Sequence, residues 1–162
     1  MKAGRALSFV GLAALAFVAS AAQALELKPY GRGSFEEIRK AHAGRPLVVH
    51  FWSATCAPCL AELPDWARVA REKKGLDIVF VNADGEGDRV KAGARLEKAG
   101  LAGVAQYGFA DDFLERLYFE VDPGWRGELP FTAMVDAGGK LVAVAGPMDE
   151  PAIAGWLSKA SP

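Results

Sequence analysis

Two hydrophobic patterns alternate along the chain. Nearly continuous apolar runs cover residues 47–52, 77–82, 104–109 and 130–136, and a further apolar run covers 141–145. Runs of this length and character are typical of strands that are buried in a sheet. Between the runs, apolar residues recur every three or four positions, which is the spacing of an amphipathic helix. The pattern therefore predicts a chain in which strands and helices alternate.

The helical spacing predicts helices over residues 34–43, 57–74, 88–99, 111–119 and 150–160. Ser34 and Glu37 have the spacing of a capping box, so Ser34 is predicted as the N-cap of the first helix. Asp111 is predicted as the N-cap of the fourth helix, with Asp112 in its first turn. Pro64 lies inside the second helix and predicts a kink there. Residues 25–33, which include one proline and two glycines, predict a short strand or loop.

The order of these elements defines a fold class. Strands that alternate with helices require parallel crossover connections, whereas the last two strands are joined by a short turn containing Gly138 and Gly139 and predict an antiparallel hairpin. We expect an α/β domain with a central mixed sheet, helices on both faces, and a C-terminal antiparallel hairpin followed by a helix.

The first residues have the composition of an export signal. Lys2 and Arg5 precede an apolar, alanine-rich run over residues 6–19, and Ala22-Gln23-Ala24 places small residues where a signal peptidase cleaves. Residues 1–24 are therefore predicted to be a cleaved signal peptide, and residues 25–162 the folded domain. The alternative is an uncleaved membrane anchor, because the apolar run is almost long enough to span a bilayer.

Composition and charge narrow the function. Apolar residues make up 51% of the chain and the net charge is −1, with the basic residues scattered, which excludes a nucleic-acid-binding surface. The only two cysteines, Cys56 and Cys59, enclose two residues. A disulfide that closes so short a loop restrains the unfolded chain little, so the pair is present for its chemistry.

The position of the cysteines indicates redox chemistry. Cys56 falls between the strand at 47–52 and the following helix, where unpaired N–H groups and the helix dipole stabilise a thiolate. Cys59 is close enough to form a disulfide with it. The alternative is a copper(I) carrier, in which two thiolates and either His50 or Met148 bind the soft ion.

Four stretches carry a family resemblance: Phe51-Trp52, Cys56-Ala57-Pro58-Cys59, Glu62-Leu63-Pro64, and Gly127 to Thr132 far along the chain. Together they resemble the thioredoxin-like superfamily and, within it, the exported thiol-disulfide oxidoreductases of the TlpA/ResA type. The resemblance covers nearly all of residues 47–156.

The resemblance implies roles for individual residues. Cys56 is the nucleophile, Cys59 is the resolving thiol, Pro130 is a cis proline that lies against the dithiol, and Glu62 is an acid that relays the proton of Cys59. Residues expected to contact the substrate are Trp52, Thr55, Ala57, Pro58 and Leu129. The resemblance implies no cofactor and no metal.

The resemblance also implies a periplasmic, monomeric enzyme. It exchanges disulfides with client proteins and receives electrons from a membrane thiol-disulfide donor. Reduction of clients is favoured over oxidation, although the motif does not fix the direction. Two positions depart from the family. Thr55 replaces the usual tryptophan before the first cysteine, and His50 stands where cytosolic thioredoxin has a buried acid.

Overall fold

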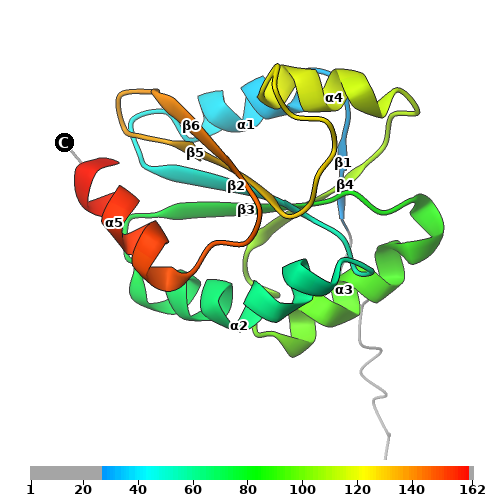
Figure 1. Ribbon diagram of the computed structural model, residues 1–162, viewed down its shortest axis with the longest axis horizontal. Coiled ribbons are helices and arrows are strands. Elements are labelled where there is room, and N and C mark those ends of the chain that lie inside the picture. The colour runs from blue at the N-terminus through cyan, green and yellow to red at the C-terminus, as the bar shows by residue number, and fades with distance from the viewer. Residues whose placement is uncertain (1–26, 161–162) are drawn as a thin grey trace, which may run out of the picture.

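A computed structural model describes residues 27–160, which form one mixed sheet and its covering helices (Figure 1). The predicted signal peptide lies outside the described residues. The strands are β1 Lys28–Tyr30, β2 Leu47–Trp52, β3 Asp77–Asn82, β4 Ala105–Phe109, β5 Phe131–Val135 and β6 Leu141–Ala145. The helices are α1 Ser34–Ala41, α2 Ala57–Glu72, α3 Arg89–Lys98, α4 Leu114–Val121 and α5 Glu150–Ala160, with a short 3₁₀ turn, η1, over Glu86–Asp88.

The strand order across the sheet is β1-β4-β3-β2-β5-β6. The first four strands in this order are parallel to one another, and β5 and β6 run antiparallel at the other side. The mixed sheet and its C-terminal hairpin confirm the predicted fold class. Strands β2 and β3 pair along their whole length: Leu47 lies opposite Asp77 and Trp52 lies opposite Asn82. The loops that follow the two strands therefore start at the same edge of the sheet.

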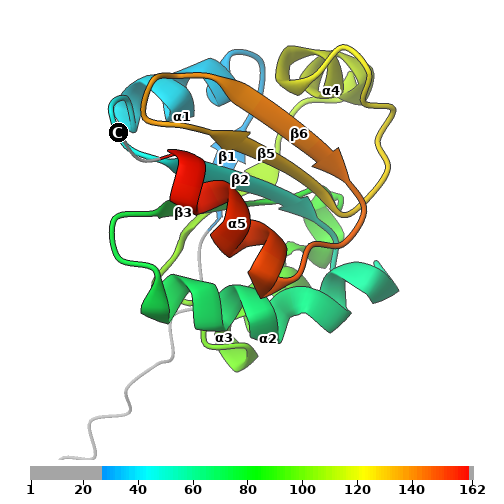
Figure 2. The ribbon, with the colours of Figure 1, turned by 60° about the vertical axis from the view of Figure 1, so that its left-hand side comes forward.

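Each face of the sheet has its own apolar core. Helices α1 and α4 cover one face, whereas α2, α3 and α5 cover the other (Figures 1 and 2). Strand β2 contributes to both cores, with Val49 and Phe51 facing α1 and α4, and Val48 and Trp52 facing α2. Successive side chains of a strand point to opposite faces, so His50 lies on the α2 side between Val48 and Trp52.

Two predicted helix caps are wrong. The N-cap of α1 is Gly33, which has a φ of 81°, and the Ser34 hydroxyl instead accepts a hydrogen bond from the backbone N–H of Gly31 at 3.0 Å. Helix α4 starts at Leu114, and Asp111 lies outside it, where its carboxylate accepts the N–H of Phe113 at 3.0 Å. In both cases a short polar side chain binds a turn N–H just before the helix.

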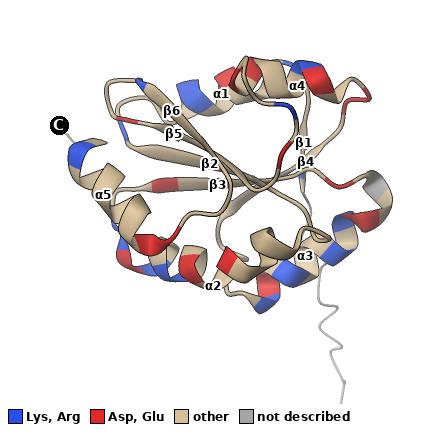
Figure 3. Cartoon of the chain, in the orientation of Figure 1, with Lys and Arg blue, Asp and Glu red and all other residues tan. Residues whose placement is uncertain are grey.

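The remaining helices follow their predicted ranges within a few residues. Helix α2 continues through Pro64 to Glu72. Acidic and basic side chains are interspersed along α2, α3 and α4 (Figure 3). No helix within residues 27–160 is both long enough and apolar enough to cross a membrane.

The loop between α4 and β5 is held by an aromatic cluster. Trp125 is 3% exposed, stacks on Phe131 with ring centroids 4.3 Å apart, and contacts Phe51 at 4.7 Å. Gly127 has a φ of 96°, and a Cβ placed on it would lie 2.8 Å from the Tyr118 ring. The chain can therefore pass this close to the cluster only with glycine at that position.

We expect Gly127→Ala to lower the free energy of unfolding more than Gly139→Ala. Both glycines have a positive φ, and a left-handed conformation costs an alanine about 1–2 kcal/mol. Gly139 has no atom within 4 Å of the added Cβ, whereas Gly127 also meets the Tyr118 ring. The further overlap should cost at least about 1 kcal/mol, as overpacking does. Urea unfolding of the two variants measures the difference, and equal losses would contradict the packing described for the loop.

Candidate active site

The two cysteines form a disulfide at the start of α2. The S–S distance is 2.02 Å and the two Cα atoms are 5.2 Å apart. Cys56 is the N-cap residue of the helix, and its sulfur accepts the backbone N–H of Cys59 at 3.2 Å. A negative charge on this sulfur is stabilised by that N–H and by the positive end of the helix dipole. Cys56 is thus placed where a thiolate is favoured.

The two sulfur-bearing residues differ in exposure. Cys59 is 0% exposed, whereas Cys56 is half-buried and is surrounded by the exposed residues Thr55, Ala57 and Pro58. A thiolate exchanges with a disulfide only if the sulfurs can approach each other. Cys56 is therefore the cysteine that a molecule in solution can approach in this structure, whereas Cys59 is covered.

The segment just before Cys56 is fixed by Asp84, which follows β3. The Asp84 carboxylate accepts hydrogen bonds from the Ser53 hydroxyl at 2.5 Å, from the Ala54 backbone N–H at 2.7 Å and from the Asn82 amide at 2.7 Å. The Ser53 proton is used by Asp84, so the Thr55 hydroxyl donates to the Ser53 oxygen at 2.9 Å. Thr55 thus belongs to the network that shapes the loop.

The segment around Pro130 approaches the disulfide from β5. The Leu129–Pro130 peptide bond is cis, as the resemblance implies. Phe131 pairs with Phe51, so Pro130 lies beside the end of β2, and Leu129 packs against the apolar cluster that contains Cys59. Pro130 itself is buried and Leu129 is half-buried.

Glu128 orders the turn that leads into this segment. Its carboxylate accepts the N–H of Arg126 at 2.9 Å, and its carbonyl accepts the indole N–H of Trp125 at 2.9 Å. The backbone N–H groups of Glu128 itself and of Arg126 hold the pKa of the Glu128 carboxyl below its usual range. Glu128 therefore remains an anion and a hydrogen-bond acceptor in mildly acidic solution.

A buried acid and a buried imidazole lie behind the disulfide. Glu62 is 4% exposed and His50 is 0% exposed, with Glu62 Oε1 3.1 Å from His50 Nε2. This separation is that of an ion pair, although the two groups are not aligned as a hydrogen bond. The other Glu62 oxygen accepts the N–H of Met148 at 2.9 Å, and His50 Nδ1 lies 3.0 Å from the Thr132 hydroxyl.

A groove runs beside the start of α2. Its volume is about 650 Å³, and it is bordered by Pro58 and Glu62 on α2 and by Met148 and Asp149 before α5. Glu62 therefore lies between the buried imidazole and a solvent-filled groove.

The sequence identified most of the residues that lie here, but not all of them. Trp52, expected to contact a client, has no exposed surface and lies in the core beside Phe80. Asp84, Thr132 and the Met148 backbone were missed. Asp84 could have been found from the predicted parallel pairing of residues 47–52 and 77–82, since polar residues after parallel strands meet at one edge of a sheet.

The comparison with known proteins agrees with the fold. No protein-family model matches the chain, and no curated protein matches it either. The structure is similar to a thioredoxin-family thiol:disulfide interchange protein from Chlorobium tepidum, with 22% identity, a TM-score of 0.60, and coverage of 75% of this chain and 83% of that one.

Two further solved structures are similar. One is a secreted Mycobacterium tuberculosis disulfide oxidoreductase homologous to E. coli DsbE, with 20% identity, a TM-score of 0.57, and coverage of 74% of this chain and 85% of that one. The other is an exposed lipoprotein thioredoxin of Streptococcus pneumoniae, with 24% identity, a TM-score of 0.58, and coverage of 74% of this chain and 88% of that one. The chain thus has the thioredoxin-like fold.

We expect Asp84→Ala to lower the free energy of unfolding of the oxidised protein by about 2–3 kcal/mol, because three donors lose a charged acceptor. Asp112→Ala removes an exposed carboxylate from the loop after β4 and should change stability by less than about 0.5 kcal/mol. Urea unfolding compares the two variants. Similar stabilities would mean that Asp84 does not anchor the loop before Cys56.

Proposed function

We propose that this protein is an exported thiol-disulfide oxidoreductase of the TlpA/ResA type, which exchanges disulfides with client proteins through Cys56 and Cys59. The observation that carries the proposal is the unequal exposure of the two cysteines at the start of α2, with Cys59 0% exposed and Cys56 accessible. An exchange enzyme needs this arrangement, because one sulfur must be accessible to the client disulfide and the other must be held close enough to resolve the mixed disulfide. The likeness to solved exchange proteins supports the same class.

In the reducing direction, the reaction starts from the reduced pair. The Cys56 thiolate attacks one sulfur of a client disulfide, which forms a mixed disulfide and releases the other client sulfur as a thiolate. Cys59 then loses its proton and attacks the Cys56 sulfur. The Cys56–Cys59 bond forms, and the second client sulfur leaves. The client is reduced by two electrons and the pair is oxidised by two.

Glu62 is the acceptor that we assign to the Cys59 proton. It lies one helical turn after Cys59 on α2, and side chains at this spacing share one helix face. Its carboxyl borders the groove, through which the proton can leave. A positioned carboxylate can act as a general base in such a step.

The client would dock around the exposed edge of the disulfide. In this proposal the exposed residues Thr55, Ala57 and Pro58 contact the client on one side and the half-buried Leu129 on the other, with the buried Pro130 supporting Leu129. The Thr55 side chain is smaller than the family tryptophan, so the Cys56 sulfur is less covered here. Trp52 acts from the core, by supporting the end of β2.

We further propose that the protein works as a periplasmic monomer and reduces its clients, with a membrane thiol-disulfide donor restoring the dithiol. The predicted signal peptide and the exported nature of the Mycobacterium tuberculosis and Streptococcus pneumoniae proteins support the location. The direction rests on the family resemblance.

The copper(I) alternative has less support. Within residues 27–160, no group of three or more His, Cys, Asp and Glu side chains is placed to hold a metal ion. The ring nitrogens of His50 face Thr132 and Glu62. Met148 is 7% exposed and packs in the core. His50 is thus engaged by two other side chains, whereas Met148 packs in the same apolar cluster as the cysteines and is the only one of the two that could join them in binding an ion.

We expect the mature protein to accelerate the reduction of insulin disulfides by dithiothreitol. The activity of Cys56→Ser should be at least about 100-fold lower, at the uncatalysed level.

Cys59→Ser should lose turnover but accumulate a covalent adduct with one client molecule, because the mixed disulfide cannot be resolved. Mass spectrometry under non-reducing conditions detects the adduct.

A matched titration with copper(I) distinguishes the two functions. A wild-type protein that reduces insulin no faster than Cys56→Ser, yet binds copper(I) through both cysteines, would refute the oxidoreductase and support the carrier. Adduct formation on Cys59 in Cys56→Ser would refute the assignment of the nucleophile.

A further inference from the structure

The pair formed by His50 and Glu62 is the least expected feature of the interior. Both side chains lie within the core on the α2 face of the sheet, where His50 contacts the rings of Trp66 at 4.8 Å and Phe80 at 5.1 Å. Among the described residues, His50 Nε2 and Glu62 Oε1 have no hydrogen-bond partner, and each has the other as its neighbour at 3.1 Å. The two atoms therefore depend on each other.

Electrostatics explains why the two groups occur together. A carboxylate buried without a cation is strongly disfavoured and takes up a proton, whereas a buried imidazolium loses its proton. Placed 3.1 Å apart, an imidazolium stabilises the carboxylate, so that Glu62 can stay ionised inside the protein.

The other contacts of the pair fix its geometry. The Thr132 hydroxyl on β5 lies at His50 Nδ1, and the Met148 N–H binds the Glu62 oxygen that does not face His50. The imidazole is thus held from β5, and the carboxyl group from the loop before α5. Both groups are oriented before any reaction starts, which is what a proton acceptor requires.

We propose that His50 is a positioning residue of the redox site, which keeps Glu62 ionised and oriented so that Glu62 accepts the proton of Cys59 during resolution of the mixed disulfide. This inference rests on the proposed function for its biological setting, but the chemistry that it describes occurs with any small disulfide. In this role His50 acts through Glu62.

The charges around the pair leave His50 as its cation. On α2, Asp65 borders the same groove as Glu62 but pairs with Arg68, which also binds Glu150 of α5 at 2.6 Å. Asp149 borders the groove and accepts the N–H of Ala152 at 2.9 Å. Strands β3 and β5 present Phe80 and Thr132 to His50, neither of which is charged.

The proposed step balances without an added reactant. The Cys59 S–H bond breaks, its proton joins Glu62, and the Cys59 thiolate attacks Cys56 as the client thiolate leaves. The client thiolate takes a proton from water, and Glu62 returns its proton to solvent through the groove.

The test uses the reduced, mature protein and 4,4′-dithiodipyridine, a small aromatic disulfide that releases a coloured thiopyridone at each of two steps. The first release reports attack by Cys56, and the second reports attack by Cys59 on the mixed disulfide. For His50→Gln we expect the first rate to change by less than about twofold and the second to fall at least about tenfold at pH 7, within the range of general-base contributions.

Combining the variants separates positioning from a structural role. In Glu62→Gln the second rate should lose the pH dependence that a carboxylate base gives it. Adding His50→Gln to that variant should slow the second step no further. A second rate that is unchanged in His50→Gln, that falls together with the first, or that falls further in the double variant than in Glu62→Gln, would overturn the proposal.

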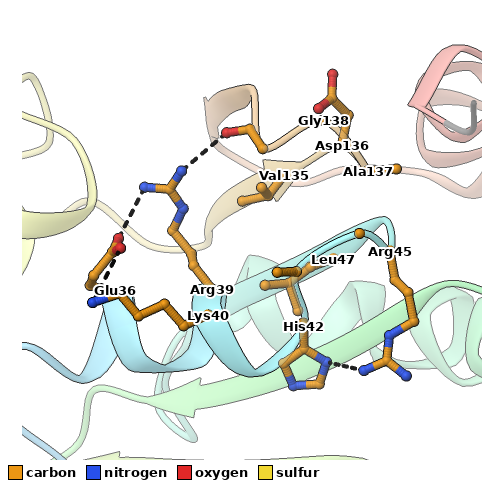
Figure 4. A pocket seen from close by; sticks show the side chains of 13 residues that line it. Glu36, Arg39, Lys40, His42, Arg45, Leu47, Val135, Asp136, Ala137 and Gly138 are labelled. Atoms are coloured by element: carbon orange, nitrogen blue, oxygen red, sulfur yellow. Dashed lines mark hydrogen bonds and ion pairs between the residues drawn. The ribbon is translucent and has the colours of Figure 1, made fainter.

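His42→Gln is the matched control, because the other histidine pairs with Asp77 at 2.7 Å near the start of β2, beside the hollow shown in Figure 4. It should alter neither rate.

If His50→Gln does not fold, Thr132→Val is the second variant. It removes the hydroxyl at His50 Nδ1 while keeping the ion pair, and it should slow only the second step. Equal second-step rates in Thr132→Val and wild type would then overturn the proposal. The two-step assay needs no client, so failure to reduce insulin would refute the proposed function alone.

Discussion

The register of β2 within the sheet is the constraint on which the site depends. Its parallel pairing with β3 puts Asp84 next to the loop before Cys56, and its antiparallel pairing with β5 puts Pro130 beside the same loop. A shift of one residue would turn Val48, His50 and Trp52 to the other face of the sheet. The disulfide, its anchoring carboxylate and the cis proline are therefore brought together by backbone pairing alone.

The same register accounts for a polar pair inside an apolar core. His50 must face α2, because its neighbours Val48 and Trp52 do so, and one turn after Cys59 the helix presents Glu62 to it. Replacing a buried ion pair by apolar residues of similar volume is often neutral or stabilising. The pair therefore fits the role that we propose for it in the second step of disulfide exchange better than a role in stability.

Much of this could be predicted from the sequence, because the relevant signals are local. Apolar runs and helical spacing gave the strands and helices, and the positions of Cys56 and Cys59 followed from the strand-to-helix junction. The helix caps failed at Ser34 and Asp111, since a short polar side chain satisfies a turn as readily as a helix N-terminus. The His50–Glu62 and Ser53–Asp84 contacts join separate elements, and only the three-dimensional register reveals them.

The reduction potential of the Cys56–Cys59 pair decides whether the two cysteines can reduce client disulfides. Equilibration of the mature protein with defined ratios of reduced and oxidised glutathione or dithiothreitol, followed by alkylation and mass spectrometry, gives this value. A reductase that uses these cysteines should have a potential of about −200 to −270 mV, in the range of glutaredoxins and thioredoxin. A value near about −120 mV would instead indicate an oxidant, and a value below about −300 mV would indicate a structural disulfide that does not exchange.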